Sequence, residues 1–506
     1  MRKTKNLQET YPIHERFKQE LKKHLPPAEV EQFLEACRKP LNRSITINLS
    51  KISIEEFKNI TSSRWRTLTE TQFTPGNATF YVDREDRDIA LGRTFLHEAG
   101  YMYIQEVAAA SSAPQLDLQP GDLVLDMASA PGGKATQLAS MLLTANSPLD
   151  KKGLGGIWNP WLVIANDVAW PRLKQLTHNL NRCGAWNTWV TKFNGFSFGK
   201  NLPNFFEHVL LDAPCSGEGT AFKSDFALKH WKIEEINKIA GTQFQLLISA
   251  IKCTKPGGTI MYSTCTINPY ENEHIIQKAK DFFAGDIEIE QIHTTNTRSG
   301  LEWSTTDIDT TKFARLWPHE QGTWGFFLAK IRKLNATDVQ YTQPHKLSPR
   351  NQFTLTMSKK LQSEANAWIQ KNFWFVLDPD RHLVAATKEK VYLTSPKFAD
   401  IQKHINLEKI GIPILKRDRL FGFRPTHYLG ALLWEHAIRH TMELTDEQAQ
   451  RYSWWKNLDL NELLLTHKQK PVSLDTTQKD YLLTRRGKWF SRTKLVKGEW
   501  KNKFGK

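Results

Sequence analysis

Hydrophobic and polar positions alternate between short apolar runs and longer segments of helical spacing from about residue 109 to 333. Short runs separated by helices are typical of parallel strands buried on both faces. A further run, 326–329, is expected to be a late edge strand. We therefore predict an α/β domain with a doubly wound parallel sheet, whose sites lie at the carboxyl ends of its strands. The predicted strands contain residues 123–125, 161–165, 189–190, 208–211 and 258–262.

The regions on either side of this domain have other patterns. Residues 1–108 are predicted to be α+β, with helical spacing from Glu15 to Ala36, a strand at 44–49 and a helix opening at Ser53. Residues 334–350 contain two prolines and are expected to be a linker. Residues 351–506 are rich in aromatic side chains and are predicted to form a mixed α/β extension with a strand at 411–415.

Two internal segments are predicted to be loops. Residues 144–160 lie between the first helix and second strand of the sheet and are rich in Gly, Pro, Asn and Lys. This insert has no assigned role. Residues 293–312 are rich in Thr and Ser.

Composition narrows the class of protein. The chain has 506 residues, long enough for two to four domains, and no apolar run approaches the roughly 18 residues of a membrane span. The first residues are charged and lack the apolar core of a secretory signal. The five cysteines are odd in number and form no CxxC pair, so we expect no zinc site or disulfide framework, no bound metal and a reducing cytoplasm.

Charge points to a polyanionic partner. The formal net charge is +16, and residues 481–506 carry nine Lys and Arg against one Glu. Four aromatic residues are interleaved with these charges, and this combination of cations and stacking rings is typical of RNA-binding surfaces. The alternative is a solvated tail whose aromatic residues pack on their own domain. We favour RNA because the net charge of the whole chain has the same sign.

The segment after the first predicted strand is the candidate cofactor site. It reads Asp126-Met-Ala-Ser-Ala-Pro-Gly-Gly-Lys134, and a Gly-Gly turn between strand and helix lets the backbone approach a ligand closely. The segment lacks both the GxGxxG pattern and the GKS or GKT ending of a P-loop. Asp167 follows the second strand, where an acid can accept both hydroxyls of a ribose. A nucleotide bearing a carboxylate, such as S-adenosylmethionine, is therefore the predicted cofactor.

Two further peptides carry the candidate chemistry. Asp212-Ala-Pro-Cys215 and Ser263-Thr-Cys265-Thr each follow an apolar run, so each places a cysteine just beyond the end of a strand. Neighbouring strands lie about 4.8 Å apart. We therefore expect Cys215 and Cys265 to flank one pocket and to perform covalent thiol chemistry. The other cysteines, Cys37, Cys183 and Cys253, are expected to be inert core residues.

Together these blocks resemble the Sun-type RNA cytosine-C5 methyltransferases. DxxxAPGGK, DAPCSGEG (212–219) and STCT (263–266) match the family blocks in order, as do 103–106, 181–184, 268–273 and 315–319. The resemblance covers about residues 35–333. The extension resembles, more weakly, that of the bacterial RsmF-like branch, which acts on small-subunit (16S) ribosomal RNA and carries a PUA-like RNA-binding module.

The resemblance implies a Rossmann-like fold, S-adenosylmethionine and an RNA cytosine as substrate. Residues 1–108 are expected to be an RNA-binding region, and residues 109–333 the methyltransferase domain. It also implies roles: Cys265 as the nucleophile, Cys215 as the residue assisting product release, Asp212 on the cytosine edge and Lys134 orienting Asp212 or a phosphate. Asn194 stands where the family often has Asp. The residues expected to hold the cofactor are Ala128, Ser129, Ala130, Pro131, Gly132, Gly133, Lys134, Asp167, Arg172, Asn194 and Asp212.

The sequence leaves the RNA open. Formation of 5-methylcytosine in 16S ribosomal RNA is the leading hypothesis. The alternatives are a transfer RNA methyltransferase and an RNA-binding assembly factor without catalysis. The target cytosine must leave its stack to reach the two thiols. We expect a monomer that binds no membrane.

Overall fold

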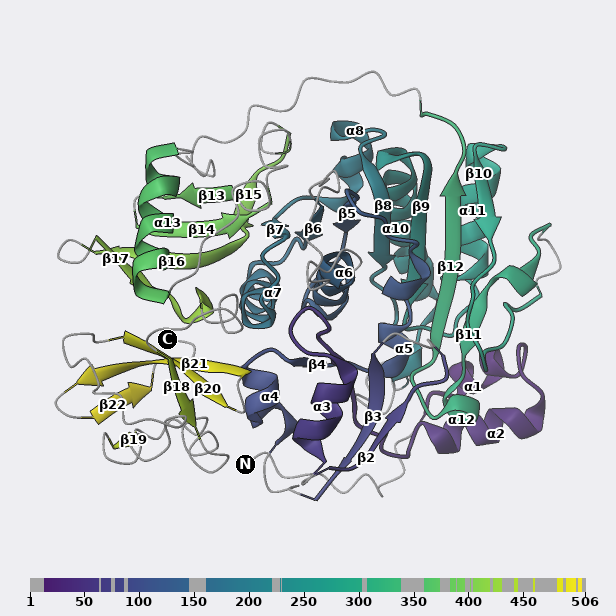
Figure 1. The fold of residues 1–506 in the computed structure, drawn as a ribbon. Helices are drawn as coiled ribbons and strands as arrows, with labels where there is room; N and C mark the ends of the chain where they lie inside the picture. Colours follow the sequence, from purple (N-terminus) through teal and green to yellow (C-terminus); the bar gives the residue numbers. More distant parts are fainter. Residues whose placement is uncertain are drawn as a thin grey trace.

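The computed structural model describes most of the chain, and the ribbon in Figure 1 shows how its elements are arranged. The last strands are described by their backbone only. The described residues are 13–62, 65–73, 78–85, 90–144, 161–220, 228, 230–302, 307–337, 359–373, 383–387, 389–395, 401, 404–418, 422–429, 441–444, 458–459, 480–485, 488–496 and 499–502.

The largest sheet contains nine strands among the described residues, in the order β10-β12-β9-β8-β5-β6-β7-β15, with β11 paired to β12. The five strands from β7 to β9 run parallel, as predicted, whereas β10, β12 and β15 pair antiparallel, so the sheet is mixed. Its strands are β5 (Leu123–Asp126), β6 (Leu162–Asn166), β7 (Thr188–Thr191), β8 (Phe206–Asp212), β9 (Thr254–Thr264), β10 (Ile287–Glu290), β11 (Ala314–Leu316), β12 (Phe326–Lys333) and β15 (Leu407–Ile410).

Helices cover both faces of this sheet. Alternate strand residues point to opposite faces, so Val124 packs in one core and Leu125 in the other. The first core includes residues of α6 (Gly133–Thr144) and α7 (Trp170–Cys183). The second includes residues of α8 (Phe198–Asn201), α10 (Ile233–Cys253) and α11 (Glu273–Phe283). The predicted doubly wound arrangement, Rossmann-like in form, is therefore present.

The strand predicted at 326–329 is not at the edge of the sheet. β12 lies between β9 and β10 and pairs with both. Its burial pattern explains the apolar run that predicted it, because seven of its eight residues are buried. Its position could not be read from the run, since an inner antiparallel strand and an edge strand can have the same composition.

The N-terminal region forms a separate four-stranded sheet in the order β2-β3-β1-β4. The helix predicted to open at Ser53 is present, and Ser53 and Glu56 form a reciprocal capping box. Its elements are β1 (Ser44–Ile47), α3 (Ile54–Thr61), β2 (Trp65–Glu70), β3 (Thr79–Arg84), α4 (Phe95–Glu98), β4 (Met102–Ile104) and α5 (Val107–Ala110).

Polar side chains join this region to the end of α7. Asn48 Nδ2 donates to the carbonyl oxygens of Gly100 and Cys183, at 2.9 and 2.8 Å. Lys51 Nζ donates to Ala99 O at 2.7 Å and Arg182 O at 3.2 Å. Burial lowers the pKa of Lys51 to about 7. These contacts satisfy carbonyls at a helix end that would otherwise be buried without partners.

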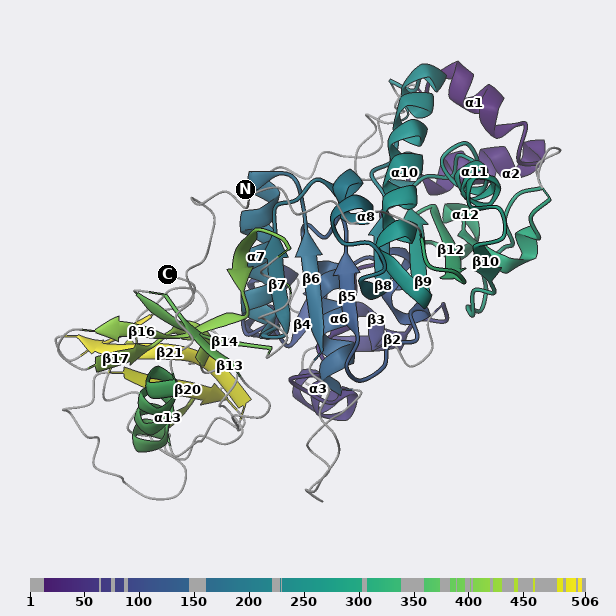
Figure 2. The same ribbon diagram turned by 90° about the horizontal axis from the view of Figure 1, so that it is seen from above.

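The helical spacing predicted from Glu15 to Ala36 is divided between two helices, α1 (Glu15–Leu21) and α2 (Pro27–Ala36). The break follows from Pro27, since proline is well placed at the first position of a helix and disfavoured inside one. Phe17 and Phe33 pack against Trp231 and Trp317, which belong to the region of the nine-stranded sheet. Both views place these helices beside α12 (Pro318–Gln321), at the opposite end of the molecule from the C-terminal strands (Figures 1 and 2).

The C-terminal extension contains two further sheets. Helix α13 (Lys359–Phe373) packs on the first of them, and the second contains the strands of the basic tail. The first sheet comprises β13 (Leu383–Ala386), β14 (Lys390–Thr394), β16 (Ile412–Asp418) and β17 (Gly422–Pro425). The second comprises β18 (Thr441–Leu444), β19 (Leu458–Asp459), β20 (Asp480–Arg485), β21 (Lys488–Val496) and β22 (Glu499–Asn502).

One strand of the extension belongs to the nine-stranded sheet. β15 pairs antiparallel with β7, and Thr191 Oγ1 donates to Asn406 O at 2.6 Å. Trp189 Nε1 donates to Thr394 Oγ1 at 2.5 Å. A strand of four residues with a distant partner has no sequence signal that reveals its pairing. Most of the predicted insert and linker lies outside the described residues, which exclude 145–160 and 338–358.

Short 3-10 helices complete the described elements. They are η1 (Leu91–Arg93), η2 (Ala113–Gln115), η3 (Gly195–Ser197), η4 (Glu218–Thr220), η5 (Thr310–Lys312) and η7 (His427–Leu429).

Candidate active site

The two predicted cysteines lie together at the carboxyl ends of β8 and β9. These strands are parallel neighbours, and their register pairs Asp212 with Ser263. Each cysteine therefore lies two or three residues beyond a paired position, and the two sulfur atoms are 3.1 Å apart. Both cysteines are partly exposed, whereas the other three are buried. Both thiols therefore lie side by side at this edge of the sheet.

A charged pair lies beside the thiols. Lys134 Nζ is 2.7 Å from Asp212 Oδ2, and Ser263 Oγ donates to Asp212 Oδ1 at 3.0 Å. Lys134 also lies over the ring of Phe326, 5.6 Å from its centroid. The Asp212 side chain stays 34% exposed, so its carboxylate is held in place yet accessible to a substrate.

The Cys215 thiol differs chemically from an isolated cysteine. The hydrogen bond with Cys265, burial and the charge of Glu271 raise the pKa of Cys215 well above its usual value. The two sulfur atoms lie within hydrogen-bonding distance of each other, and either can be the donor.

Close backbone contacts fix the loop that follows Cys215. Gly219 N–H donates to Cys265 O at 3.1 Å, and Gly325 N–H donates to Gly219 O at 3.0 Å. A side chain at position 219 would place its Cβ 2.1 Å from Gly325 O. Glycine is therefore needed at position 219, because the backbones of residues 219, 265 and 325 lie in close contact there.

Buried carboxylates lie behind the two thiols. Glu218 accepts hydrogen bonds from Trp231 Nε1 and Asn268 Nδ2, at 2.6 and 3.2 Å, and burial raises its pKa to about 7. Glu273 forms a two-point ion pair with Arg315, with N–O distances of 2.7 and 2.6 Å. Both partners of this pair are almost completely buried.

The loop between β5 and α6 packs closely on α7. Gly132 has φ +108°, and a Cβ there would lie 2.9 Å from Leu176 Cδ1. Neither side-chain oxygen of buried Asp126, just before the loop, has a hydrogen-bond partner, and burial raises its pKa to about 7. The loop contains a cis peptide bond between Ala130 and Pro131, with Ala128 and Ser129 before it and Gly133 after it.

Arg172 links this loop to Asp167. Its Nη2 donates to Ala130 O at 2.6 Å, and its Nη1 lies 3.4 Å from Asp167 Oδ2. Asp167 Oδ1 accepts the backbone N–H of Ala169 at 2.9 Å. The carboxylate is thus oriented at the start of α7, while the Arg172 side chain remains 56% exposed.

The third strand end is arranged by two asparagines. Asn194 is exposed, and its Oδ1 accepts the backbone N–H of Phe196 at 3.1 Å. Asn166 is buried, donates to Met127 O and Phe193 O at 3.0 Å, and accepts the N–H of Phe193 at 2.8 Å. Asn166 therefore ties together the loops after β5 and β7. The sequence analysis did not identify Asn166. This residue ends an apolar run, and nothing in its position indicates that its side chain joins two loops.

These residues fit S-adenosylmethionine. Asp167 lies directly after β6, where a carboxylate can accept ribose hydroxyls. The side-chain oxygens of Asp126, the last residue of β5, are buried without a hydrogen-bond partner. The structure brings the predicted cofactor residues to the ends of three adjacent strands, β5, β6 and β7, with Lys134 and Asp212 at the border with the thiols.

Sequence reasoning also gave no role to Ser263, Glu218 and Glu271, which lie within blocks that it quoted. For Glu218 and Glu271, the available signal was the presence of an acid in a glycine- or proline-containing block that follows a buried strand. Such an acid is costly to bury without partners, so its retention in the block indicates a specific contact.

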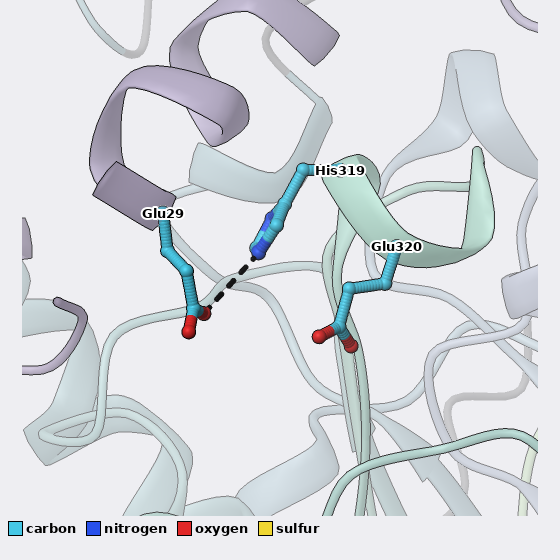
Figure 3. A group of neighbouring side chains, drawn as sticks. All are labelled: Glu29, His319 and Glu320. Atoms are coloured by element: carbon cyan, nitrogen blue, oxygen red, sulfur yellow. Dashed lines mark ion pairs between the residues drawn. The ribbon is translucent and has the colours of Figure 1, made fainter. Parts of the chain in front are cut away.

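A second group of titratable side chains lies away from the thiols. Glu29, His319 and Glu320 come from α2 and α12 and point toward one another (Figure 3). Arg298 already pairs with both carboxylates, with Nη1 2.8 Å from Glu29 Oε2. His319 Nε2 lies 3.5 Å from the same oxygen. Because Arg298 already pairs with both carboxylates, we interpret this group as a contact that docks α2 on α12.

Comparison with known proteins now identifies the family. Residues 113–332 match the sequence family described as 16S rRNA methyltransferase RsmB/F, and residues 13–107 match the N-terminal domain of 16S rRNA methyltransferase RsmF. Ribosomal RNA small subunit methyltransferase F of Vibrio cholerae serotype O1 (strain M66-2) is 32% identical over 453 residues, which cover 88% of this chain and 89% of that protein. The chain belongs to the RsmB/F family.

Other relatives agree with this membership. The protein of the same name from Vibrio parahaemolyticus is 30% identical and covers 94% of this chain and 92% of its own length. The crystal structure of a methyltransferase homolog from Pyrococcus horikoshii has 30% identity and a TM-score of 0.53, covering 63% of this chain and 95% of that one. Membership in the RsmB/F family confirms the predicted class, a ribosomal RNA methyltransferase that uses S-adenosylmethionine. Among the described helices, none is long and apolar enough to cross a membrane.

Proposed function

We propose that this protein methylates C5 of a cytosine in 16S ribosomal RNA through a covalent adduct with Cys265. The observation that carries the proposal is the pair of sulfur atoms 3.1 Å apart, beside the Lys134–Asp212 pair. Such a pair of thiols and a carboxylate suits a substrate that must be attacked at one carbon and deprotonated at the next.

The first step is addition of the Cys265 sulfur to C6 of the cytosine. The new S–C6 bond makes C5 electron-rich, because the electrons of the C5–C6 double bond shift toward C5. Asp212, held by Lys134 and Ser263, lies where it can bind the polar edge of the ring and stabilise the charge that develops there. When bound, S-adenosylmethionine supplies the methyl group that C5 accepts.

The last step requires loss of the C5 proton. A base removes that proton, its bonding electrons restore the C5–C6 double bond, and the Cys265 sulfur leaves as a thiolate. Cys215 is in position to act as this base. The largest cause of its raised pKa is the neighbouring Cys265 sulfur. That cause disappears when Cys265 is bound to carbon, so adduct formation itself makes Cys215 easier to deprotonate.

The C-terminal extension is proposed to hold the RNA, through a PUA-like module. Support comes from the nine cationic residues of 481–506. Five of them, Arg485, Lys488, Arg492, Lys494 and Lys501, lie in β20, β21 and β22, which are neighbours in one sheet. Truncation after residue 350 would also remove β15 from the catalytic sheet. We further propose that the protein is cytoplasmic and monomeric. Size-exclusion chromatography tests the oligomeric state directly.

The experiment uses Cys215→Ser protein, 16S ribosomal RNA and S-adenosylmethionine. After denaturation, we expect an RNA-linked protein band that is absent without RNA and absent from the Cys215→Ser, Cys265→Ser double variant. Wild-type methyl transfer without any such band in Cys215→Ser would contradict the assigned cysteine roles.

Bisulfite sequencing of RNA treated with the wild-type protein identifies the substrate. New 5-methylcytosine in 16S ribosomal RNA supports the proposal. Methylation of transfer RNA alone would replace ribosomal RNA as the substrate, and binding of RNA without any methylation would favour an assembly factor.

A further inference from the structure

The residues that follow the two cysteines are hydrogen-bonded to each other. Ser216 Oγ lies 2.9 Å from Thr266 Oγ1. The two thiols and these two hydroxyls thus form parallel links between the loops after β8 and β9. The sulfur contact alone would be lost whenever Cys265 binds carbon, whereas the hydroxyl contact need not be.

A carboxylate and an amide hold the backbone on both sides of Cys215. Glu271 Oε2 accepts the N–H of Ser216 at 2.9 Å and Nε2 of Gln243 at 2.8 Å. The same Gln243 nitrogen donates to Pro214 O at 2.8 Å. Residues 214 and 216 are therefore fixed through one shared pair of side chains, Glu271 and Gln243.

The Cys265 side has a corresponding support. Thr266 Oγ1 lies 3.1 Å from Glu218 Oε2 and accepts the backbone N–H of Asn268 at 3.2 Å. Glu218 and Glu271 are both almost completely buried, and burial raises the pKa of each. Burying two carboxylates close together is costly, and apolar side chains of similar size could stabilise the fold as well. Their presence here points to a geometric role.

We propose that Glu271 is a positioning residue that holds Cys215 against Cys265 by way of Ser216, and that the Ser216–Thr266 contact couples the two cysteine loops. The inference rests on the proposed function only for the roles of the two cysteines. Its consequence is selective: attack by Cys265 depends on the β9 loop, whereas release of the product depends on the β8 loop being held beside it.

The variants separate these two loops. Ser216→Ala removes the hydroxyl link, Ser216→Thr retains a hydroxyl, and Glu271→Gln keeps the size but replaces an acceptor with a donor. Thr254→Val is a matched control, because Thr254 is buried at the start of β9 and donates to Ala250 O at 2.8 Å, far along the strand from the thiols. Single-turnover methyl transfer, steady-state kcat and the amount of denaturant-resistant protein–RNA adduct are measured for each protein.

For Ser216→Ala and Glu271→Gln we expect kcat to fall about tenfold, the loss of roughly one hydrogen bond, with less than about a threefold fall in the single-turnover rate. The adduct should accumulate, and Ser216→Thr should restore kcat. Thr254→Val should change the melting temperature without changing the ratio of the two rates. Equal losses in both rates, without adduct, would overturn the positioning role.

A second measurement needs no RNA. Hydrogen peroxide removes one hydrogen from each thiol, so that an S–S bond forms and two water molecules are released, and the protein loses two hydrogens in mass. Closure of Cys215 with Cys265 should be at least threefold slower in Glu271→Gln than in wild type. Unchanged closure contradicts the positioning role whatever the enzyme methylates. Slower closure in a protein that methylates no RNA would instead leave positioning in place and reject the proposed function.

Discussion

The two halves of the catalytic edge differ in how firmly they are held. At the cysteine half, after β8 and β9, buried Glu218, Glu271 and the Glu273–Arg315 pair anchor the loops, and backbone bonds join the loops directly. At the cofactor half, after β5 to β7, Asp167 is oriented by the half-exposed Arg172 and Asn194 is exposed.

Apolar exposure shows the same difference. Three of the five large hydrophobic side chains that are exposed among the described residues lie just after β6 and β7: Val168, Trp170 at the start of α7 and Phe196 in η3. The comparison teaches that one half is preorganised for bond making and the other is left open for binding, so changes in the two halves should affect different measurements.

Replacement of the nucleophile should give the largest effect. Cys265→Ser is expected to lower methyl transfer on the order of a thousandfold or more, because a serine hydroxyl is far less reactive than a thiolate. Binding of S-adenosylmethionine, measured by calorimetry, should change less than about twofold. A substantially active Cys265→Ser protein would contradict the assignment of Cys265 as the nucleophile.

Loss of Arg315 should destabilise the cysteine half next most strongly. Arg315→Met leaves the Glu273 carboxylate buried without its partner, which typically costs about 3–5 kcal/mol. We expect a clear fall in the melting temperature. As a control, Arg315→Met combined with Glu273→Leu should recover most of the loss, since replacing both charges by apolar groups is often neutral. No recovery would mean that the pair is needed for another reason.

Stability should also depend on pH through Glu218. Its folded pKa, about 7, lies above the usual value of 4.5, so the neutral form is favoured in the fold. Its stabilising contribution is complete below about pH 4.5 and is lost as pH rises through about 7, up to about 3 kcal/mol. Between pH 5 and 8, wild type should therefore lose more stability than Glu218→Gln in matched denaturant titrations. Parallel curves for the two proteins would contradict this.

The sequence predicted the site residues better than it predicted the residues that hold them in place. The strands, the two cysteines, Lys134 and Asp212 lie as expected because parallel strands bring their carboxyl ends to one edge, so a motif directly after a strand is placed by topology alone. The position of β12 inside the sheet and the joining of β15 to β7 were not predicted, since strand pairing depends on partners distant in sequence.

The supports were missed for a related reason. Glu271 contacts Ser216 across 55 residues, and Asn166 contacts Phe193 across 27 residues. No spacing rule connects such pairs in a single sequence. The loop at 144–160 and RNA binding by the basic tail remain predictions.

At the cofactor half, loss of the Asp167 carboxylate should weaken binding. Hydrogen bonds to a charged group contribute about 1.5–3 kcal/mol each, so Asp167→Ala should raise the Kd for S-adenosylmethionine about 10- to 100-fold. Single-turnover methyl transfer at saturating cofactor should remain close to that of wild type. A large fall in the saturated rate with an unchanged Kd would reverse the comparison between the two halves.

The smallest expected effect concerns Arg172. Arg172→Lys keeps the charge but loses the planar fork that reaches both Ala130 O and Asp167. The Arg172 side chain is 56% exposed and its Nη1 lies 3.4 Å from the buried Asp167 carboxylate, so the contribution of Arg172 should be below about 1 kcal/mol, which corresponds to less than about a fivefold rise in the cofactor Kd. Arg172→Leu removes the charge as well as the fork. A similarly small rise in the cofactor Kd would indicate that Arg172 only orients the loop. A rise in Kd as large as that of Asp167→Ala would mean that the cofactor half is as rigidly built as the cysteine half. Titration of both variants at low and high salt decides between these outcomes, since a purely electrostatic contribution weakens with salt and an oriented loop does not.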